Sequence, residues 1–113
     1  MAELIKDKKE IEKIINEKIK GKRLNFTQHY RVKGAWRGIP DEKVLKIFPQ
    51  FNKVFVIQKK KLKFGDFGYE LFYDTGNNIT FSIAICPVNG RIDVIHAIEY
   101  KRSLKYKFRE DSE

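Results

Sequence analysis

The sequence predicts an α+β domain, in which helices come first and an antiparallel sheet follows. Two observations predict this class. Up to Pro49, apolar residues recur at three- and four-residue spacing, which is typical of helices with one buried face. After Pro49, they alternate with polar residues, which is typical of strands. Helices followed by consecutive strands favour a sheet that is covered by helices on one face.

Length and composition predict one folded unit. A chain of 113 residues can build one core but not two ordinary domains, so residues 1–113 are expected to form a single domain. The hydrophobic fraction of 42% is ordinary for a globular protein, and nine Phe and five Tyr supply bulky packing groups. Only the end, residues 110–113, is expected to fray.

The number of cysteines and the charges near the N-terminus indicate the cellular compartment of the protein. Cys86 is the single cysteine, which excludes an intramolecular disulfide and a cysteine-cluster zinc site. The first twenty residues carry many charges and do not resemble a signal peptide, and no apolar run is long enough to span a membrane. A cytoplasmic protein without membrane contact is therefore expected.

The first predicted element is an amphipathic helix over Glu3–Lys20, within residues 1–20, closed by Gly21. Its polar face is expected to be solvated, with an interaction with another chain as the alternative. The apolar positions with helical spacing are Leu4, Ile5, Ile11, Ile14, Ile15 and Ile19.

Two shorter helices are expected next. Asn25 or Thr27 can cap a second helix that ends at Arg37, although Gly34 weakens it. Gly38 suits the end of that helix, and Pro40 with the acidic residues after it suits the start of a third. Pro49 ends the third helix, whose buried face is formed by Val44, Leu45, Ile47 and Phe48.

The remaining segments predict a meander of four strands or slightly more. Asn77-Asn78 and Asn89-Gly90 fall between alternating segments and mark tight turns. The basic tail, residues 101–109, is expected to dock as an extra strand or a short helix. The predicted strand segments are Val54–Ile57 with a continuation through Leu62, Tyr69–Tyr73, Ile79–Cys86 and Ile92–Tyr100.

Charge is distributed unevenly. The net charge is +9, yet residues 65–100 contain one arginine against five carboxylates, a balance of −4. The chain before and after this section is basic. Such asymmetry favours a polyanionic partner, such as a nucleic acid, which meets one face of the protein. A lysine-rich surface with no specific partner is the competing interpretation.

A ladder of cationic and imidazole side chains lies on the predicted second helix. His29, Lys33 and Arg37 follow each other at four-residue steps and therefore share one stripe. An anion such as a phosphate would relieve the repulsion within this stripe. The alternative is a solvated edge of a packing helix.

A second cluster lies at the end of the last predicted strand. His96 is expected on the face shared by Ile92, Val94, Ile98 and Tyr100, and Lys101 and Arg102 follow. RNA cleavage without metal needs groups that move protons and cations that stabilise the phosphorane. His96 and Tyr100 are candidates for proton transfer, with Arg102 and His29 as further catalytic candidates. A histidine satisfied within the core is the alternative for His96.

A run of lysines is the third basic feature. Lys59, Lys60, Lys61 and Lys63 suit contacts with a phosphate backbone, as do Lys33, Arg37 and Lys101. The alternative is that the lysines protect a sheet edge from pairing with other chains.

Several other chemistries lack their motifs. No glycine loop for phosphate is present, the two histidines make a weak case for a metal, and no cofactor is expected. Cys86 is interpreted as a packed thiol.

Two stretches resemble a known family. "HYRVKGAWRGI", from His29 to Ile39, resembles the H-x-x-x-R-x-x-x-R-G-I opening of small uncharacterised domains related to RelE/ParE-type toxins. "KFGDFGYELFYD", from Lys63 to Asp74, is similar to the G-D-Y-R-V-x-Y strand of the RelE-like proteins. The similarity covers about residues 26–106.

This resemblance implies a RelE-like fold and, in many relatives, a metal-independent ribonuclease that acts on messenger RNA, often on the ribosome. It also implies an acidic antitoxin-like partner that wraps the basic surface; an oligomer is compatible with it. The chain departs from the pattern at Gly68, where the toxins carry a catalytic arginine, and at Ile85-Cys86-Pro87, which lacks a charge. A non-catalytic module that binds nucleic acid or protein is therefore the alternative function.

Overall fold

The computed structural model describes residues 2–63 and 65–105, except for the side chains of residues 33–37. It has the predicted α+β class, with helices and a six-stranded sheet. The helical elements are α1 (Lys8–Ile14), the π-helical turn η1 (Ile15–Ile19), α2 (Gln28–Arg37), α3 (Asp41–Ile47) and the 3₁₀ turn η2 (Phe51–Lys53). The strands are β1 (Glu3–Ile5), β2 (Arg23–Phe26), β3 (Val54–Lys61), β4 (Phe67–Gly76), β5 (Ile79–Val88) and β6 (Arg91–Tyr100).

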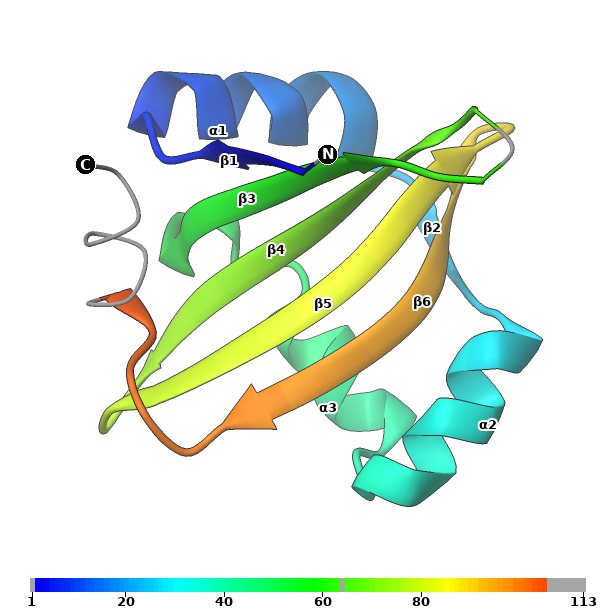
Figure 1. The fold of residues 1–113 in the computed structure, drawn as a ribbon, viewed down its shortest axis with the longest axis vertical. Helices are drawn as coiled ribbons and strands as arrows, with labels where there is room; N and C mark the ends of the chain where they lie inside the picture. The colour runs from blue at the N-terminus through cyan, green and yellow to red at the C-terminus, as the bar shows by residue number, and fades with distance from the viewer. Residues whose placement is uncertain (1, 64, 106–113) are drawn as a thin grey trace.

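The strands lie in the order β1-β3-β4-β5-β6-β2 (Figure 1). The four central strands form the predicted antiparallel meander. Two edge strands extend it, because β1 pairs antiparallel with β3 and β2 pairs parallel with β6. The sheet is therefore larger than the four-stranded core of the prediction.

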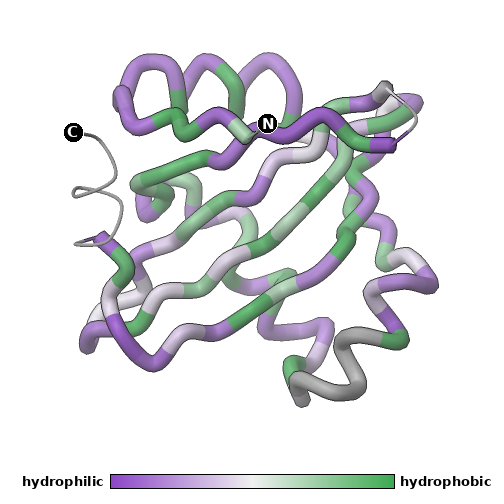
Figure 2. The backbone as a smooth tube through the Cα atoms, viewed as in Figure 1, coloured by the Kyte–Doolittle hydropathy of each residue, from purple (hydrophilic) through white to green (hydrophobic). Residues whose placement is uncertain are grey.

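The N-terminal helix begins later than predicted. Residues Glu3–Ile5 form β1, and the Asp7 side chain caps α1 by accepting a hydrogen bond from the Glu10 N–H at 3.1 Å. Beyond the strand, the predicted apolar stripe is confirmed, since Ile11, Ile15 and Ile19 are buried. Figure 2 shows hydrophilic and hydrophobic residues alternating along this segment. These residues pack against the sheet of the same chain, so the sheet covers the apolar face of this helical segment.

The second helix is joined to β6 by its capping residue. Thr27 accepts a hydrogen bond from the Tyr30 N–H at 3.1 Å and donates its hydroxyl to the Val94 carbonyl at 2.8 Å. Arg31 then forms an ion pair with Asp41 at the start of α3. These contacts confirm Thr27 as the cap and fix α2 beside the last strand.

The main core lies between the helices and one face of the sheet. Val44, Ile47 and Phe48 of the α3 region pack in it together with Tyr73, whose hydroxyl donates to the Phe48 carbonyl at 2.7 Å. In Figure 1, α3 lies behind the sheet and the opposite face turns toward the viewer. We call this opposite face the open face.

A β-bulge in β6 decides which face His96 occupies. Ala84 of β5 pairs with His96, but the next residue, Ile85, pairs with Val94, so Ile95 is an extra residue. The bulge shifts the alternation by one position, and Ala97 rather than His96 enters the main core. The prediction that His96 shares a face with Ile92 and Val94 is wrong, because simple alternation does not include the bulge.

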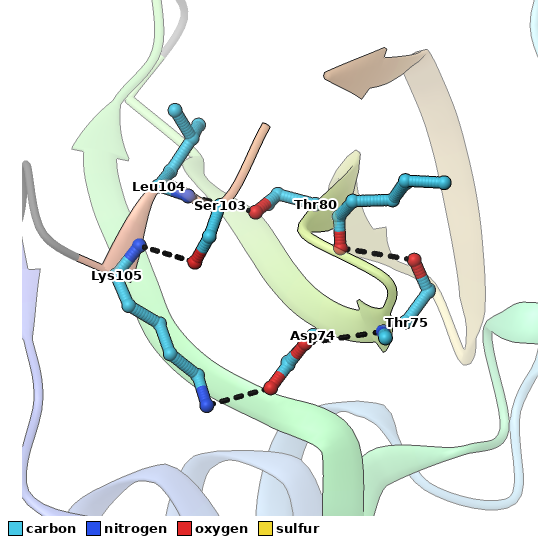
Figure 3. Close-up of polar contacts among 8 residues, drawn as sticks. Asp74, Thr75, Thr80, Ser103, Leu104 and Lys105 are labelled. Atoms are coloured by element: carbon cyan, nitrogen blue, oxygen red, sulfur yellow. Dashed lines mark hydrogen bonds and ion pairs between the residues drawn. The ribbon is translucent and has the colours of Figure 1, made fainter. Parts of the chain in front are cut away.

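After β6, the chain turns back across part of the open face. Leu104 is buried against Val56 and Phe72, and its N–H donates to the Thr80 hydroxyl at 2.9 Å. Lys105 forms an ion pair with Asp74 at 2.6 Å (Figure 3). We call residues 103–105 the strap. Of the predicted docking of residues 101–109, the part from residue 106 onward lies outside the described residues.

Candidate functional site

A groove of about 430 Å³ is hollowed into the open face. It crosses the four central strands, beside the part of the face that the strap covers. The described residues that line it are Ala2, Gln58, Lys60, Leu62, Gly68, Tyr69, Glu70, Ala84, Ile85, Ile95 and His96.

Strand pairing places the polar groups of the groove in one row. Gln58 of β3 pairs with Glu70 of β4, Glu70 pairs with Ala84 of β5, and Ala84 pairs with His96 of β6. Residues that are paired in register point to the same face of a sheet. The four side chains therefore form a line across the open face, and small Ala84 leaves the space through which Glu70 and His96 approach each other.

Glu70 and His96 face each other at 3.6 Å, measured from the carboxylate Oε2 to the imidazole Nε2. This distance allows an ion pair but is too long for a hydrogen bond. Both side chains are largely buried, with 19% of Glu70 and 27% of His96 exposed. Nε2 itself is inaccessible to solvent and has no hydrogen-bond partner among the described residues. A ring nitrogen in this position can donate to or accept from a group that enters the groove.

The lysine run divides between the two faces. Lys60 lines the groove, whereas the Lys59 ammonium lies over the Phe67 ring at 4.5 Å. Alternation along β3 turns Lys61 to the same side as Lys59. Of the four lysines, Lys60 alone is a described lining residue of the groove.

The arrangement has the parts of a proton-transfer site. A carboxylate can accept a proton, an imidazolium can donate one, and a lysine beside them can attract an anion. Desolvation by the surrounding sheet strengthens the interactions of these groups with a bound phosphate. The groove can therefore support general acid–base chemistry on a phosphate ester.

Tyr100, Arg102 and Lys101 are not brought to the groove. Tyr100 lies four residues beyond His96, about 13 Å along the strand, and packs near Leu104 of the strap. Arg102 is exposed beyond the end of β6. Lys101 lines a separate hollow with Gly38 and Lys43.

The predicted ladder on α2 forms a separate feature. His29 is exposed on the first turn of α2, and its neighbour Tyr30 packs in the main core, on the helix side of the sheet. The side chains of Lys33 and Arg37 lie outside the described residues. Among the described residues, none from α2 lines the groove.

Cys86 is a buried thiol near two carboxylates. Burial is the main cause that raises the pKa of Cys86, and the negative charges of Asp66 and Asp93 raise it further. Asp93 pairs with Cys86 across the strands and has a lowered pKa, chiefly because it accepts a hydrogen bond from Arg91. A raised pKa disfavours the reactive thiolate, which agrees with the interpretation of Cys86 as a packed residue.

In the part of the chain that the structure describes, neither a metal cluster nor a membrane-spanning helix is found. Within residues 2–63 and 65–105, no three metal-binding side chains gather. None of the described helices is long and apolar enough to cross a membrane.

Glu70 and Gln58 are site residues that the sequence interpretation missed. Glu70 is the one polar residue in the run from Phe67 to Tyr73 of β4, and Gln58 precedes the lysine run in β3. Both are therefore polar residues within central strands of the sheet. This signal was present, but placing them beside His96 requires the register of four strands, β3 to β6.

Comparison with known proteins adds no relatives: no family model, no curated protein and no solved structure matches the chain.

Proposed function

We propose that this protein binds RNA on the open face and cleaves it without a metal ion. One observation carries the proposal: Glu70 and His96 face each other in a groove that Lys60 also lines. The excess of positive charge supports RNA as the anion, because a net charge of +9 attracts a polyphosphate over long range. The resemblance to RelE-like toxins supports the same activity.

The reaction assigned to the groove needs one base and one acid. The Glu70 carboxylate takes the proton of a ribose 2′-hydroxyl, and the 2′-oxygen forms a bond to phosphorus. The bond from phosphorus to the 5′-oxygen breaks, and protonated His96 gives its proton to the leaving oxygen. Lys60 stabilises the negative charge of the phosphorane. The products are a 2′,3′-cyclic phosphate and a 5′-hydroxyl end.

The distance of 3.6 Å between Glu70 and His96 is compatible with both the entry of substrate and the return of the proton after cleavage. A phosphodiester that enters between Glu70 and His96 separates them and exposes the buried Nε2. After cleavage, Glu70 holds a proton and His96 lacks one. Once the product leaves, the groups return to 3.6 Å, where a small rotation allows the proton to pass back.

The proposal differs from the toxin pattern in its catalytic groups. Gly68 replaces the arginine of that pattern, and a Cβ atom at this position would lie 3.1 Å from the Leu62 side chain. A long side chain would therefore displace Leu62. The proposed chemistry uses Glu70 and His96 instead, and an acidic antitoxin-like protein that covers the groove is the corresponding partner.

The test is a ribonuclease assay with purified protein in EDTA, on free RNA and on ribosome-bound messenger RNA. We expect fragments with 2′,3′-cyclic phosphate ends from the wild-type protein, and a loss of about 10²–10⁴-fold with His96→Ala. His29→Ala is the matched control, because it removes an exposed imidazole outside the groove. RNA that stays intact both on and off ribosomes would contradict the proposed cleavage. If that RNA is nevertheless bound, the protein acts as the alternative, a non-catalytic module that binds nucleic acid.

A further inference from the structure

The sheet has an open edge next to His96. β2 pairs with β6 only through Arg91–Val94, although β6 continues to Tyr100. In the part of the chain that the structure describes, β5 is the only strand that pairs with the rest of β6. We call residues 96–100 the β6 edge. The outer side of such a strand presents backbone N–H and C=O groups that can pair with another extended chain.

The fold leaves room for a strand alongside the β6 edge. After Thr27, α2 turns to the helix side of the sheet, where its Tyr30 packs in the main core. A hollow of about 360 Å³ lies between the edge, at Ile98 and Glu99, and the loop that joins α2 to α3. Beyond the end of β6, the strap carries the chain onto the open face (Figure 1). The chain therefore does not continue into the space beside the edge.

The edge fits a second copy of itself in one register. Two identical strands pair antiparallel about a two-fold axis perpendicular to the sheet, so paired residues point to the same face. Pairing centred on Ile98 uses the whole edge and joins His96 to Tyr100 of the second copy. A centre one residue earlier reaches Val94, where β2 already pairs. A centre one residue later uses only the last part of the edge.

This register brings Tyr100 of the second copy beside His96. Both residues lie on the open face, since His96 lines the groove and Tyr100 packs near Leu104. The Cβ atoms of directly paired residues are about 4.5–5.5 Å apart, whereas the two residues lie about 13 Å apart along a single strand. A symmetric pair of copies therefore joins an imidazole and a phenol that one chain keeps apart.

We propose that two copies of this chain pair through their β6 edges and that Tyr100 of each copy completes the groove of the other. The phenol donates a hydrogen bond to a phosphate oxygen held beside His96. The pairing goes beyond the proposed function, and only the role of Tyr100 rests on it. Each copy carries a net charge of +9, so salt or a bound polyanion that screens this charge favours the pair.

Cross-linking at the two-fold axis tests the pairing without any RNA cleavage. Cys86→Ser removes the single cysteine, and Ile98→Cys then places one thiol opposite its copy at a Cα distance that a disulfide can bridge. The control is Val32→Cys in the same background, on α2, where the native side chain is 57% exposed.

Both variants are incubated with a mild oxidant in about 0.5 M salt, which screens the repulsion between copies. We expect the linked dimer to form at least tenfold faster with Ile98→Cys than with Val32→Cys. Equal or slower linking would overturn the pairing. Light scattering of the wild-type protein in the same salt is the second measurement, and a monomer mass at millimolar concentration would overturn it as well.

Mixing two variants tests the shared groove. His96→Ala and Tyr100→Phe are each expected to cleave RNA at least tenfold more slowly than the wild-type protein. A mixture forms mixed dimers with one complete groove, so it should recover roughly a quarter of the wild-type activity, as random pairing requires. No recovery would overturn the role of Tyr100.

The outcomes separate this inference from the proposed function. A protein that cross-links through residue 98 but leaves RNA intact retains the pairing and loses the ribonuclease. One that cleaves RNA but neither cross-links nor forms dimers retains the ribonuclease and loses the pairing.

Discussion

Glu70 and His96 are the residues on which the chemistry depends. Their separation of 3.6 Å and their shared burial distinguish them from four other ion pairs of the described residues, Arg31–Asp41, Lys43–Glu99, Arg91–Asp93 and Lys105–Asp74. Those four lie at 2.5–2.8 Å and each includes an exposed partner. Exposed ion pairs of this kind mostly contribute less than about 1 kcal/mol to stability. The Glu70–His96 pair lies in a groove that Lys60 also lines, so a phosphodiester that enters there meets a base, an acid and a cation together once it separates the pair.

The first prediction concerns the carboxylate of this pair. Glu70→Gln keeps the shape of the side chain but removes the base, so we expect RNA cleavage to fall by about 10²–10⁴-fold. Glu99→Gln is the matched control: Glu99 is similarly buried, with 23% of its side chain exposed, but it pairs with Lys43 outside the groove. Rates are measured by single-turnover cleavage of a labelled RNA. Equal losses in both variants would assign the effect to stability rather than to catalysis.

The second prediction concerns Cys86. Because burial and the charges of Asp66 and Asp93 raise the pKa of its thiol, less thiolate exists at neutral pH than for an ordinary cysteine. We expect the native protein to react with a disulfide reagent at least about tenfold more slowly than the urea-unfolded chain. Cys86→Ser should cleave RNA at the wild-type rate. Fast labelling of the native protein, or loss of cleavage in the variant, would give the thiol a role.

At the scale of elements, hydrophobic spacing predicted the helices and the meander but not the edges of the sheet. The three residues of β1 and the four of β2 are too short for a periodic pattern to show. Helical spacing includes Leu4 and Ile5 equally well, so only pairing with β3 assigns them to a strand. For such short segments, pairing with a neighbouring strand decides the secondary structure, because the local sequence pattern is compatible with both a helix and a strand.

The same limit applies to the site. His96 and Lys60 could be named from residue type alone, because imidazole and lysine are suited to phosphate chemistry. The face of the sheet on which His96 lies could not be decided from the pattern, because one bulge residue, Ile95, turns His96 to the open face. Glu70 was missed because its partner is 26 positions away in sequence and two strands away in space.

The strap provides a prediction at this scale. Leu104 is 5% exposed and fills the space beside Val56 and Phe72, so Leu104→Ala is expected to lower the free energy of unfolding by about 2 kcal/mol. Lys105→Ala removes an ion pair whose two side chains are 53% and 38% exposed, and it should cost less than about 1 kcal/mol. Urea unfolding measures both. A larger loss for the lysine variant would mean that charge, rather than burial, holds the strap.

At the scale of the whole molecule, positive charge acts at two ranges. The net charge of +9 steers any polyanion toward the protein, whichever face the lysines occupy. Contact with a phosphate needs a cation at the groove, and among the lysines of the β3–β4 hairpin the structure describes only Lys60 there. Steering and contact can be separated, because Lys60 and Lys61 are neighbours that point to opposite faces.

The last prediction uses this pair of lysines. If three to five cations of the protein neutralise RNA phosphates, raising salt from 50 to 200 mM should weaken binding by roughly 20- to 130-fold, as counterion release from single strands requires. At a given salt concentration, Lys60→Ala should bind RNA more weakly than the wild-type protein, and its salt dependence should be less steep by about one phosphate contact. Lys61→Ala removes the same charge but should change the affinity by less than about threefold. Fluorescence anisotropy with a labelled single-stranded RNA measures all three proteins. Equal effects of the two substitutions would mean that RNA binding depends only on the total charge of the protein. That result would contradict binding of RNA on the open face.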